Sequence, residues 1–321
     1  MMEEHEYMNE LIVKRGLKRE SNRIGLALLL FLLSQYAVYF LLYVVTVIFS
    51  KDGIGALLEK KAISPLLEQV IMLCSYSVSA LVAIAVLNKG QSWKFERPKK
   101  PFDFLTLPIY FGSYLPIMLI SLIYVSIMNM LGLKGVDIVI PFPDNTIGRV
   151  IYLLQYALMP AFLEELLFRG VLLERLRKYG NVLAITMSSL VFALMHGNAV
   201  GFLFIFMLGL VFGYMTVISE SLIPSIIMHL LNNSVALLSS NFENDIWVTS
   251  AISISIIALG IVGIIVTAVY ISTNKNKKQF RVPREKGPIM NRVYNFLLTP
   301  GMIIFICATF AMTVLVEIFA A

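Results

Sequence analysis

The sequence predicts an all-α protein, built as a polytopic transmembrane helical bundle of about nine spans. Hydrophobic residues make up 58% of the 321 residues and charged residues only 14%, whereas a soluble domain carries roughly 25% charged residues. A helix that spans a bilayer needs about 20 mostly apolar residues. Runs of that kind are expected to form spans at 24–49, 66–87, 104–131, 147–163, 182–197, 201–218, 222–241, 246–271 and 299–321.

A polar arm of 23 residues, with five basic and five acidic side chains, precedes the first of these runs. The apolar run 24–49 is too long for the core of a signal peptide and lacks a small-residue cleavage site. We therefore expect it to be retained as the first span. Cys74 and Cys307 both lie in apolar runs, and two cysteines are too few for a disulfide framework.

The positions of the basic residues predict how the spans are oriented, because cytoplasmic loops are enriched in Lys and Arg. If the N-terminus is cytoplasmic, the segments on that side hold 21 of the 26 basic residues: 1–23, 88–103, 164–181, 219–221 and 272–298. We therefore expect a multi-pass protein with its N-terminus inside and its C-terminus outside, in the plasma membrane of a bacterium. The net charge of +6 then points to a membrane surface and not to nucleic acid, and the basic loop 272–298 would touch anionic headgroups.

A few polar residues lie inside or at the ends of the apolar runs, where ionisable side chains are costly and mark function by default. Two short runs, 147–163 and 182–197, flank most of them. These residues are Glu164 and Glu165 after the fourth run, His196 at the end of the fifth, and His229, Asn232 and Asn233 in the seventh.

Helix geometry predicts that three of these side chains meet. The fourth span should continue as one helix of about 30 residues to a turn near Tyr179–Gly180, with Glu164 about 15 residues before that turn and His196 about 17 residues after it. At 1.5 Å per residue, an antiparallel hairpin brings both to roughly 22–26 Å from the turn. A second hairpin near Glu220 brings His229 to the same depth if the first projects roughly 10 Å further.

The spacing of the neighbouring residues predicts different roles for Glu164 and Glu165. Glu165 and Arg169 are four residues apart with the acid first, so they can pair on one helix face. Glu164 points about 100° away and is expected to keep a free carboxylate. A simpler interpretation of the acidic pair is the start of an interfacial amphipathic helix, where acids favour the N-terminal dipole.

The whole set suits hydrolysis. A carboxylate that is partly removed from water is a stronger base and can take a proton from water, while imidazoles hold that water or a metal. Phe192 and His196 share one helix face, as do His229 and Asn233. His229 and Asn233 could donate hydrogen bonds to a developing oxyanion.

The three motifs that carry these residues resemble those of a known family. In chain order they are Glu164-Glu165-Leu-Leu-Phe-Arg169, Phe192-Ala-Leu-Met-His196 and His229-Leu-Leu-Asn-Asn233. This pattern is similar to that of the CPBP family (CAAX protease and bacteriocin-processing, also called Abi), intramembrane proteases related to the Ras-converting prenyl-protein endopeptidases. The resemblance covers roughly residues 150–240, including the small residues Gly209 and Gly213, and departs from the family at Glu220, where relatives tend to carry Gly.

The resemblance implies a site that opens to lipid and cytoplasm, in which Glu164 and His196 activate water. His229 and Asn233 would support the scissile carbonyl, while Glu165 and Arg169 would hold the helices together. Two chemistries remain open: Glu164, His196 and His229 could bind one Zn²⁺ or other divalent metal with an open position, or the site could use Glu-activated water without a cofactor.

We expect three parts along the chain: an N-terminal arm with three spans at 1–149, the catalytic helices at 150–241, and two C-terminal spans with the basic loop at 242–321. The predicted function is an intramembrane endopeptidase, of metalloprotease or glutamate type, that cuts a membrane-associated peptide, lipidated or not. Its partners would be that substrate and the lipid bilayer. The alternative is a peptide-binding or bacteriocin-immunity protein on the same scaffold that does not cut. A proton-coupled transporter is a third possibility, against which the lack of an evident inverted repeat counts.

Overall fold

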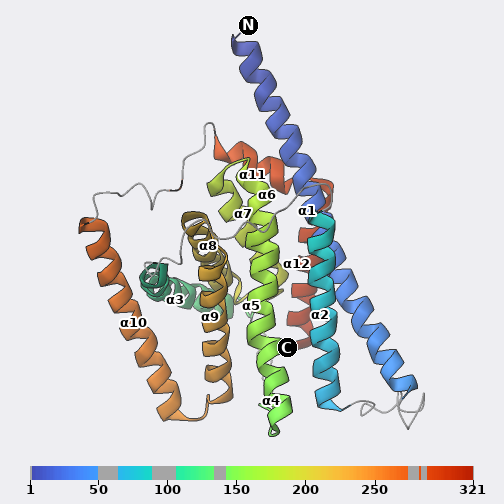
Figure 1. The fold of residues 1–321 in the computed structure, drawn as a ribbon, viewed down its shortest axis with the longest axis vertical. Coiled ribbons are helices and arrows are strands. Elements are labelled where there is room, and N and C mark those ends of the chain that lie inside the picture. Colours follow the sequence, from blue (N-terminus) through green and yellow to red (C-terminus); the bar gives the residue numbers. More distant parts are fainter. Residues whose placement is uncertain are drawn as a thin grey trace.

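The computed structural model is an all-helical bundle (Figure 1), and it describes residues 2–49, 64–88, 106–133, 142–273, 282 and 288–320. Six basic residues of the predicted loop 272–298 lie outside these ranges: Lys275, Lys277, Lys278, Arg281, Arg284 and Lys286.

The predicted fold class is confirmed. Eight helices in the described part of the chain are long and apolar enough to cross a membrane, and the remaining predicted span, 182–197, forms the shorter apolar helix α7 (Asn181–Met195). The others are α1 (Met2–Ile48), α2 (Pro65–Asn88), α3 (Thr106–Met130), a composite helix from Thr146 to Arg177, α8 (Phe202–Ser219), α9 (Ile223–Asn241), α10 (Ile246–Thr273) and α12 (Pro300–Ala320).

The composite helix is the element that carries the first motif. It is 32 residues long and runs through α4 (Thr146–Leu153), η2 (Leu154–Leu158), α5 (Met159–Glu164), η3 (Glu165–Leu173) and α6 (Glu174–Arg177). It ends at the predicted turn, where Gly180 has a φ of 132°, a conformation that glycine adopts without strain. The segments η2 and η3 are π-helical, a widened turn that is rare and frequently occurs at functional sites.

Small residues set the closest helix contacts. An added Cβ on Gly209 would lie 3.0 Å from the Cβ of Ser189, so α8 and α7 touch along this face. The crossing of α1 and α12 is tighter, since a Cβ on Gly25 would lie 2.3 Å from the carbonyl carbon of Gly301. Such close approach is typical of helices that associate in lipid, where van der Waals packing replaces the hydrophobic effect.

The arrangement places α1 and α2 against the composite helix. In Figure 1 α10 stands at the left edge of the bundle and α1 and α2 stand at the right, with the composite helix, α8 and α9 between them. One hydrophobic core joins α1, α2, η3 and α7. The short helix α11 (Ile289–Leu297) packs on α1, buries Phe296 completely and leaves Met290 and Tyr294 more than half exposed. The candidate site lies where α1 and α2 meet the composite helix and α7.

Candidate active site

Three helices bring the predicted carboxylate and imidazoles together. Glu164 is the last residue of α5, His196 directly follows α7, and His229 lies in the first half of α9. The Oε2 atom of Glu164 is 3.7 Å from Nε2 of His229 and 4.0 Å from Nε2 of His196. These separations are too long for direct hydrogen bonds, so the three side chains lie close together without bonding to one another.

The other nitrogen of each imidazole fixes how the ring is presented. Nδ1 of His229 is 2.9 Å from Oε1 of Glu165, and Nδ1 of His196 is 2.8 Å from the backbone oxygen of Phe192. Both partners are oxygens that only accept, so each Nδ1 carries the hydrogen and donates it. In the neutral rings, the two Nε2 lone pairs therefore face Glu164.

The predicted pair Glu165–Arg169 is present in the structure and completely buried. Arg169 donates from Nη1 to Oε1 of Glu165 at 2.8 Å, and both side chains have no exposed surface. Its Nη2 donates to the backbone oxygen of Gly209 in α8 at 3.2 Å, and its guanidinium lies 4.3 Å from the ring centre of Phe192 in α7. Arg169 thus connects the composite helix to α7 and α8, and Glu165 extends the connection through His229 to α9.

Aromatic rings enclose His229 on two sides. The ring of Phe212 stacks on the imidazole with centroids 5.3 Å apart and planes 25° apart, while Phe192 meets it edge-on at 5.8 Å. Phe192 also packs edge-on against His196 at 4.7 Å. The predicted supporting residue Phe192 therefore contacts both imidazoles and the guanidinium of Arg169.

The last predicted site residue, Asn233, lies one helical turn beyond His229 on α9. Its Oδ1 is 3.4 Å from Nδ2 of Asn232, and Oδ1 of Asn232 accepts a hydrogen bond from the phenol of Tyr114 at 3.3 Å. The structure thus places Asn233 beside the three-residue cluster on the same helix as His229, but among the described residues no hydrogen bond joins it to Glu164, His196 or His229.

One participant was not predicted from the sequence. The phenol of Tyr76 in α2 donates a hydrogen bond to Oε1 of Glu164 at 2.6 Å. The expectation of a free Glu164 carboxylate is therefore wrong for this oxygen, while Oε2 is buried and has no hydrogen-bond partner among the residues that the structure describes. A tyrosine between two serines in the middle of an apolar run was the available signal, but its partner lies 88 residues away in sequence.

A cavity of about 150 Å³ borders this cluster, between α1, α2, the composite helix and α7. Most of its wall is apolar, with Phe31, Phe168 and Met195 among the lining residues. Its polar lining is made by Gln35, Tyr76, Glu164 and His196. The carboxyl group of Glu164 and the imidazole of His196 therefore both line this cavity, whereas His229 does not.

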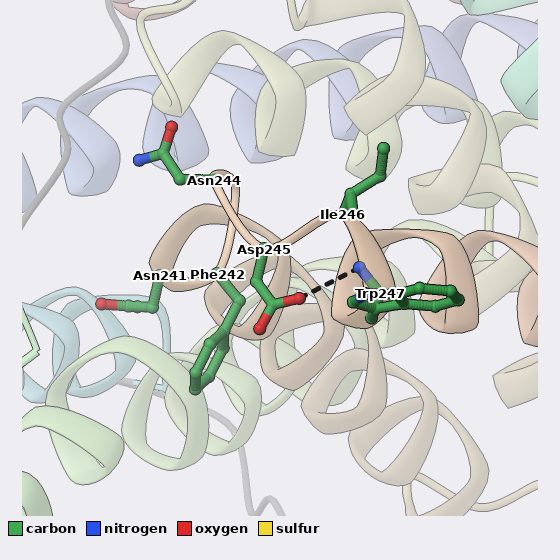
Figure 2. A pocket seen from close by; sticks show the side chains of 6 residues that line it. All are labelled: Asn241, Phe242, Asn244, Asp245, Ile246 and Trp247. Carbon is green, nitrogen blue, oxygen red and sulfur yellow. Dashed lines mark hydrogen bonds between the residues drawn. The ribbon is translucent and has the colours of Figure 1, made fainter.

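A larger, open hollow of about 480 Å³ lies at the turn between α9 and α10 (Figure 2). Its lining residues are Asn241, Phe242, Asn244, Asp245, Ile246 and Trp247. The Asp245 carboxylate accepts hydrogen bonds from the backbone N–H groups of Trp247 and Val248, at 3.0 and 3.2 Å, and so caps the start of α10. None of the predicted site residues lies there, so the smaller cavity beside Glu164 is the candidate site.

The metal alternative has a geometric test. Among the described residues, no group of three His, Cys, Asp or Glu side chains is arranged so that it could hold a metal ion. Glu164, His196 and His229 therefore do not fit a metal in the arrangement seen, and the chemistry below is derived from the side chains alone.

One comparison of the sequence with known protein families found a match. Residues 146–235 match the family of type II CAAX prenyl endopeptidase Rce1-like proteins. This match confirms the resemblance seen in the motifs, and it supports a CAAX-type intramembrane endopeptidase. The Rce1-like segment begins with α4 and ends inside α9, so it contains all three motifs but not α1, α2 or α3. No curated protein and no solved structure matches the chain.

Proposed function

We propose that this protein is an intramembrane endopeptidase that hydrolyses a peptide bond in a membrane-associated peptide with a water molecule activated by Glu164. The observation that carries the proposal is the free oxygen of that carboxylate. Glu164 Oε2 is buried, has no hydrogen-bond partner in the described parts of the chain, and faces the Nε2 atoms of His229 and His196 at 3.7 and 4.0 Å. A buried polar atom without a partner is costly, and here it lies where a water and a scissile carbonyl would meet.

In the first step, the two hydrogens of one water molecule interact with different side chains. The water donates one hydrogen bond to Nε2 of His196, which orients it, and transfers its other proton to Oε2 of Glu164. Its oxygen then forms a bond to the carbonyl carbon, and the carbonyl electron pair moves onto oxygen. In the second step the C–N bond breaks, and Glu164 returns its proton to the leaving amine.

The oxyanion needs hydrogen-bond donors, which His229 and Asn233 would supply. Because Nδ1 of His229 already donates to Glu165 at 2.9 Å, Nε2 becomes a donor only when the ring is protonated. Asn233, one turn further along α9, would supply the second donor from its side-chain amide.

The substrate would reach the site from the membrane plane. The cavity beside Glu164 has a mostly apolar wall, and the family description names prenylated proteins as the substrates of related endopeptidases. A peptide held in the bilayer, with or without a lipid group, would therefore present its scissile bond beside the cluster. We place the N-terminus in the cytoplasm, the C-terminus outside, and the protein in the plasma membrane of a bacterium.

The test compares peptides released by cells that carry the native protein with those from cells that carry Glu164→Ala at matched membrane levels. Glu174→Ala is the matched control, because Glu174 lies on the same composite helix and its side chain is 40% exposed. We expect a fragment that is present with the native protein and the control, and absent with Glu164→Ala. Identical peptide profiles, with a phenotype that still depends on the protein, would overturn proteolysis and favour a binding or immunity protein.

A further inference from the structure

The Rce1-like segment does not contain every group that contacts the proposed base. Tyr76 lies on α2, outside residues 146–235, and its phenol is 2.6 Å from Oε1 of Glu164. An ionised carboxylate only accepts hydrogen bonds, so the phenol is the donor. A distance in this range is typical of a charge-assisted O–H···O⁻ bond, which is stronger than a neutral one.

The surroundings of Tyr76 distinguish this bond from the other polar contacts of α2. The hydroxyls of Ser75, Ser77 and Ser79 donate to backbone oxygens of their own helix, at 2.9, 2.7 and 2.7 Å. The Tyr76 hydroxyl instead crosses to the composite helix, and its ring is supported edge-on by Phe31 of α1 at 5.7 Å. Two helices outside the matched segment therefore determine where this donor lies.

The hydrogen bond gives the two oxygens of Glu164 different roles. Oε1 is held by Tyr76, while Oε2 has no hydrogen-bond partner among the described residues and faces the two imidazoles. Building on the proposed function, we propose that Tyr76 is a positioning residue of the active site: its phenol holds Oε1 so that Oε2 stays directed at the water that His196 orients.

The physical reason is the looseness of the last torsion of a glutamate side chain. Rotation about that bond is broad and does not settle in sharp staggered wells, so packing of the aliphatic part alone does not orient the carboxylate. A misplacement of about 1 Å costs on the order of 100-fold in rate. Loss of the phenol should therefore lower kcat by roughly 10- to 100-fold and leave KM within about twofold, because Tyr76 aligns the base.

The experiment uses the purified full-length protein in lipid nanodiscs and the variant Tyr76→Phe, which keeps the ring and removes only the hydroxyl. Tyr39→Phe is the matched control, because the Tyr39 phenol also donates to a glutamate of another helix: it bonds from α1 to Oε1 of Glu68 in α2, at 3.2 Å. The probe is a pool of internally quenched peptides that end in a CAAX sequence, in which three residues follow the farnesylated cysteine. A selective fall in kcat for Tyr76→Phe, with melting temperatures equal for all three proteins, supports positioning. Equal kcat for the two variants overturns it.

A second measurement does not depend on any substrate. Infrared difference spectra between the native protein and Glu164→Gln identify the carboxyl bands of Glu164, and Tyr76→Phe should shift them while Tyr39→Phe should not. If the native protein leaves every peptide in the pool uncut, the proposed function fails for this substrate class, and the infrared bands still decide the role of Tyr76. Unshifted bands would overturn the positioning role even if the variant lost activity through a lower melting temperature.

Discussion

Two regions of this protein contain a buried arginine paired with a glutamate, and they differ in which polar atoms lack a hydrogen-bond partner among the described residues. One is the cluster around Glu164 and Glu165. The other lies where α1 meets the tip of the first hairpin: Arg175 donates from Nε and Nη2 to Oε2 of Glu20, at 2.9 and 2.6 Å, and Lys178 donates to Oε1 of Glu20 at 3.1 Å. We call the second group the tip cluster, defined by Glu20, Arg175 and Lys178.

The tip cluster uses its remaining donors on backbone. Arg175 Nη1 donates to the carbonyl of Leu87 at 2.5 Å, and nearby Arg23 Nη2 donates to that of Val86 at 2.7 Å. Both carbonyls belong to the last turn of α2, where arginine side chains stabilise unpaired helix carbonyls. Both carboxylate oxygens of Glu20 accept hydrogen bonds, so the tip cluster has a structural role and holds helices together.

The Glu164 cluster keeps hydrogen-bonding capacity unused. Among the described residues, Oε2 of Glu164, Oε2 of Glu165 and Nε of Arg169 are buried and have no hydrogen-bond partner, and the Nε2 atoms of the two imidazoles face the first of these atoms. Native structures satisfy nearly all buried polar groups, and each exception calls for an explanation. A buried ion pair alone therefore does not mark an active site, whereas a buried pair beside an unpaired carboxylate oxygen does.

The largest difference should come from removing one charge in each cluster. Glu164→Gln keeps the size of the side chain and removes the base, so kcat should fall by about 10²- to 10⁴-fold, with the melting temperature unchanged or raised. Glu20→Gln should lower the melting temperature and leave kcat per folded molecule unchanged. Kinetics and thermal melts of both variants measure this, and the comparison breaks if Glu20→Gln selectively loses activity.

The next largest effect concerns stability within the Glu164 cluster. Arg169→Ala removes the partner of Glu165, whose side chain has no exposed surface, and breaking a buried pair in this way costs about 3–5 kcal/mol. We expect low membrane abundance together with low activity. Abundance is measured by blotting with Arg169→Lys as the milder companion, and normal abundance with a selective loss of activity would instead place Arg169 in the chemistry.

A smaller loss is expected for the corresponding change in the tip cluster. In Arg175→Ala, Glu20 keeps its contact with Lys178, and both Arg175 and Glu20 border solvent, with side chains 4% and 14% exposed. The cost should be about 2 kcal/mol, the scale of a hydrogen bond to a charged group. Denaturation should show this loss while kcat per folded molecule stays native, and a fall in kcat would show that the hairpin tip controls the site from a distance.

The surface pair Glu174–Arg177 gives the lower end of the scale. Its Oε1 and Nη1 atoms are 2.8 Å apart, but the side chains are 40% and 30% exposed. Solvent-exposed pairs contribute about 0–1 kcal/mol. Arg177→Ala should therefore leave kcat unchanged and shift the melting temperature by a few degrees at most. A loss of stability as large as that of Arg175→Ala would mean that burial does not explain the difference between the two ion pairs.

Sequence patterns predicted much of this arrangement because its determinants are local. Apolar runs located the spans, and counting the rise per residue from the turn at Gly180 brought Glu164 and His196 to one depth. The π-helical segment η3 was not predicted, because side-chain periodicity does not show whether a backbone N–H bonds to the fourth or to the fifth residue before it. The helical structure of the polar arm in α1 was not predicted either. Tyr76 was missed for a different reason: its bond to Glu164 joins segments that only the packing of α2 on the composite helix brings together.

A chelator tests whether the unpaired atoms of the Glu164 cluster bind water or a metal ion. In the mechanism proposed here Glu164 and His196 bind water and His229 faces the oxyanion, so treatment with a chelator such as 1,10-phenanthroline should leave kcat unchanged and purified protein should carry less than one divalent metal per chain. The arrangement of these three side chains is the ground for this expectation, since it does not meet the geometry of a metal site. Inhibition by the chelator that is reversed by Zn²⁺, together with about one metal ion per chain that is lost in His196→Ala, would show that the same unpaired atoms close on a metal instead.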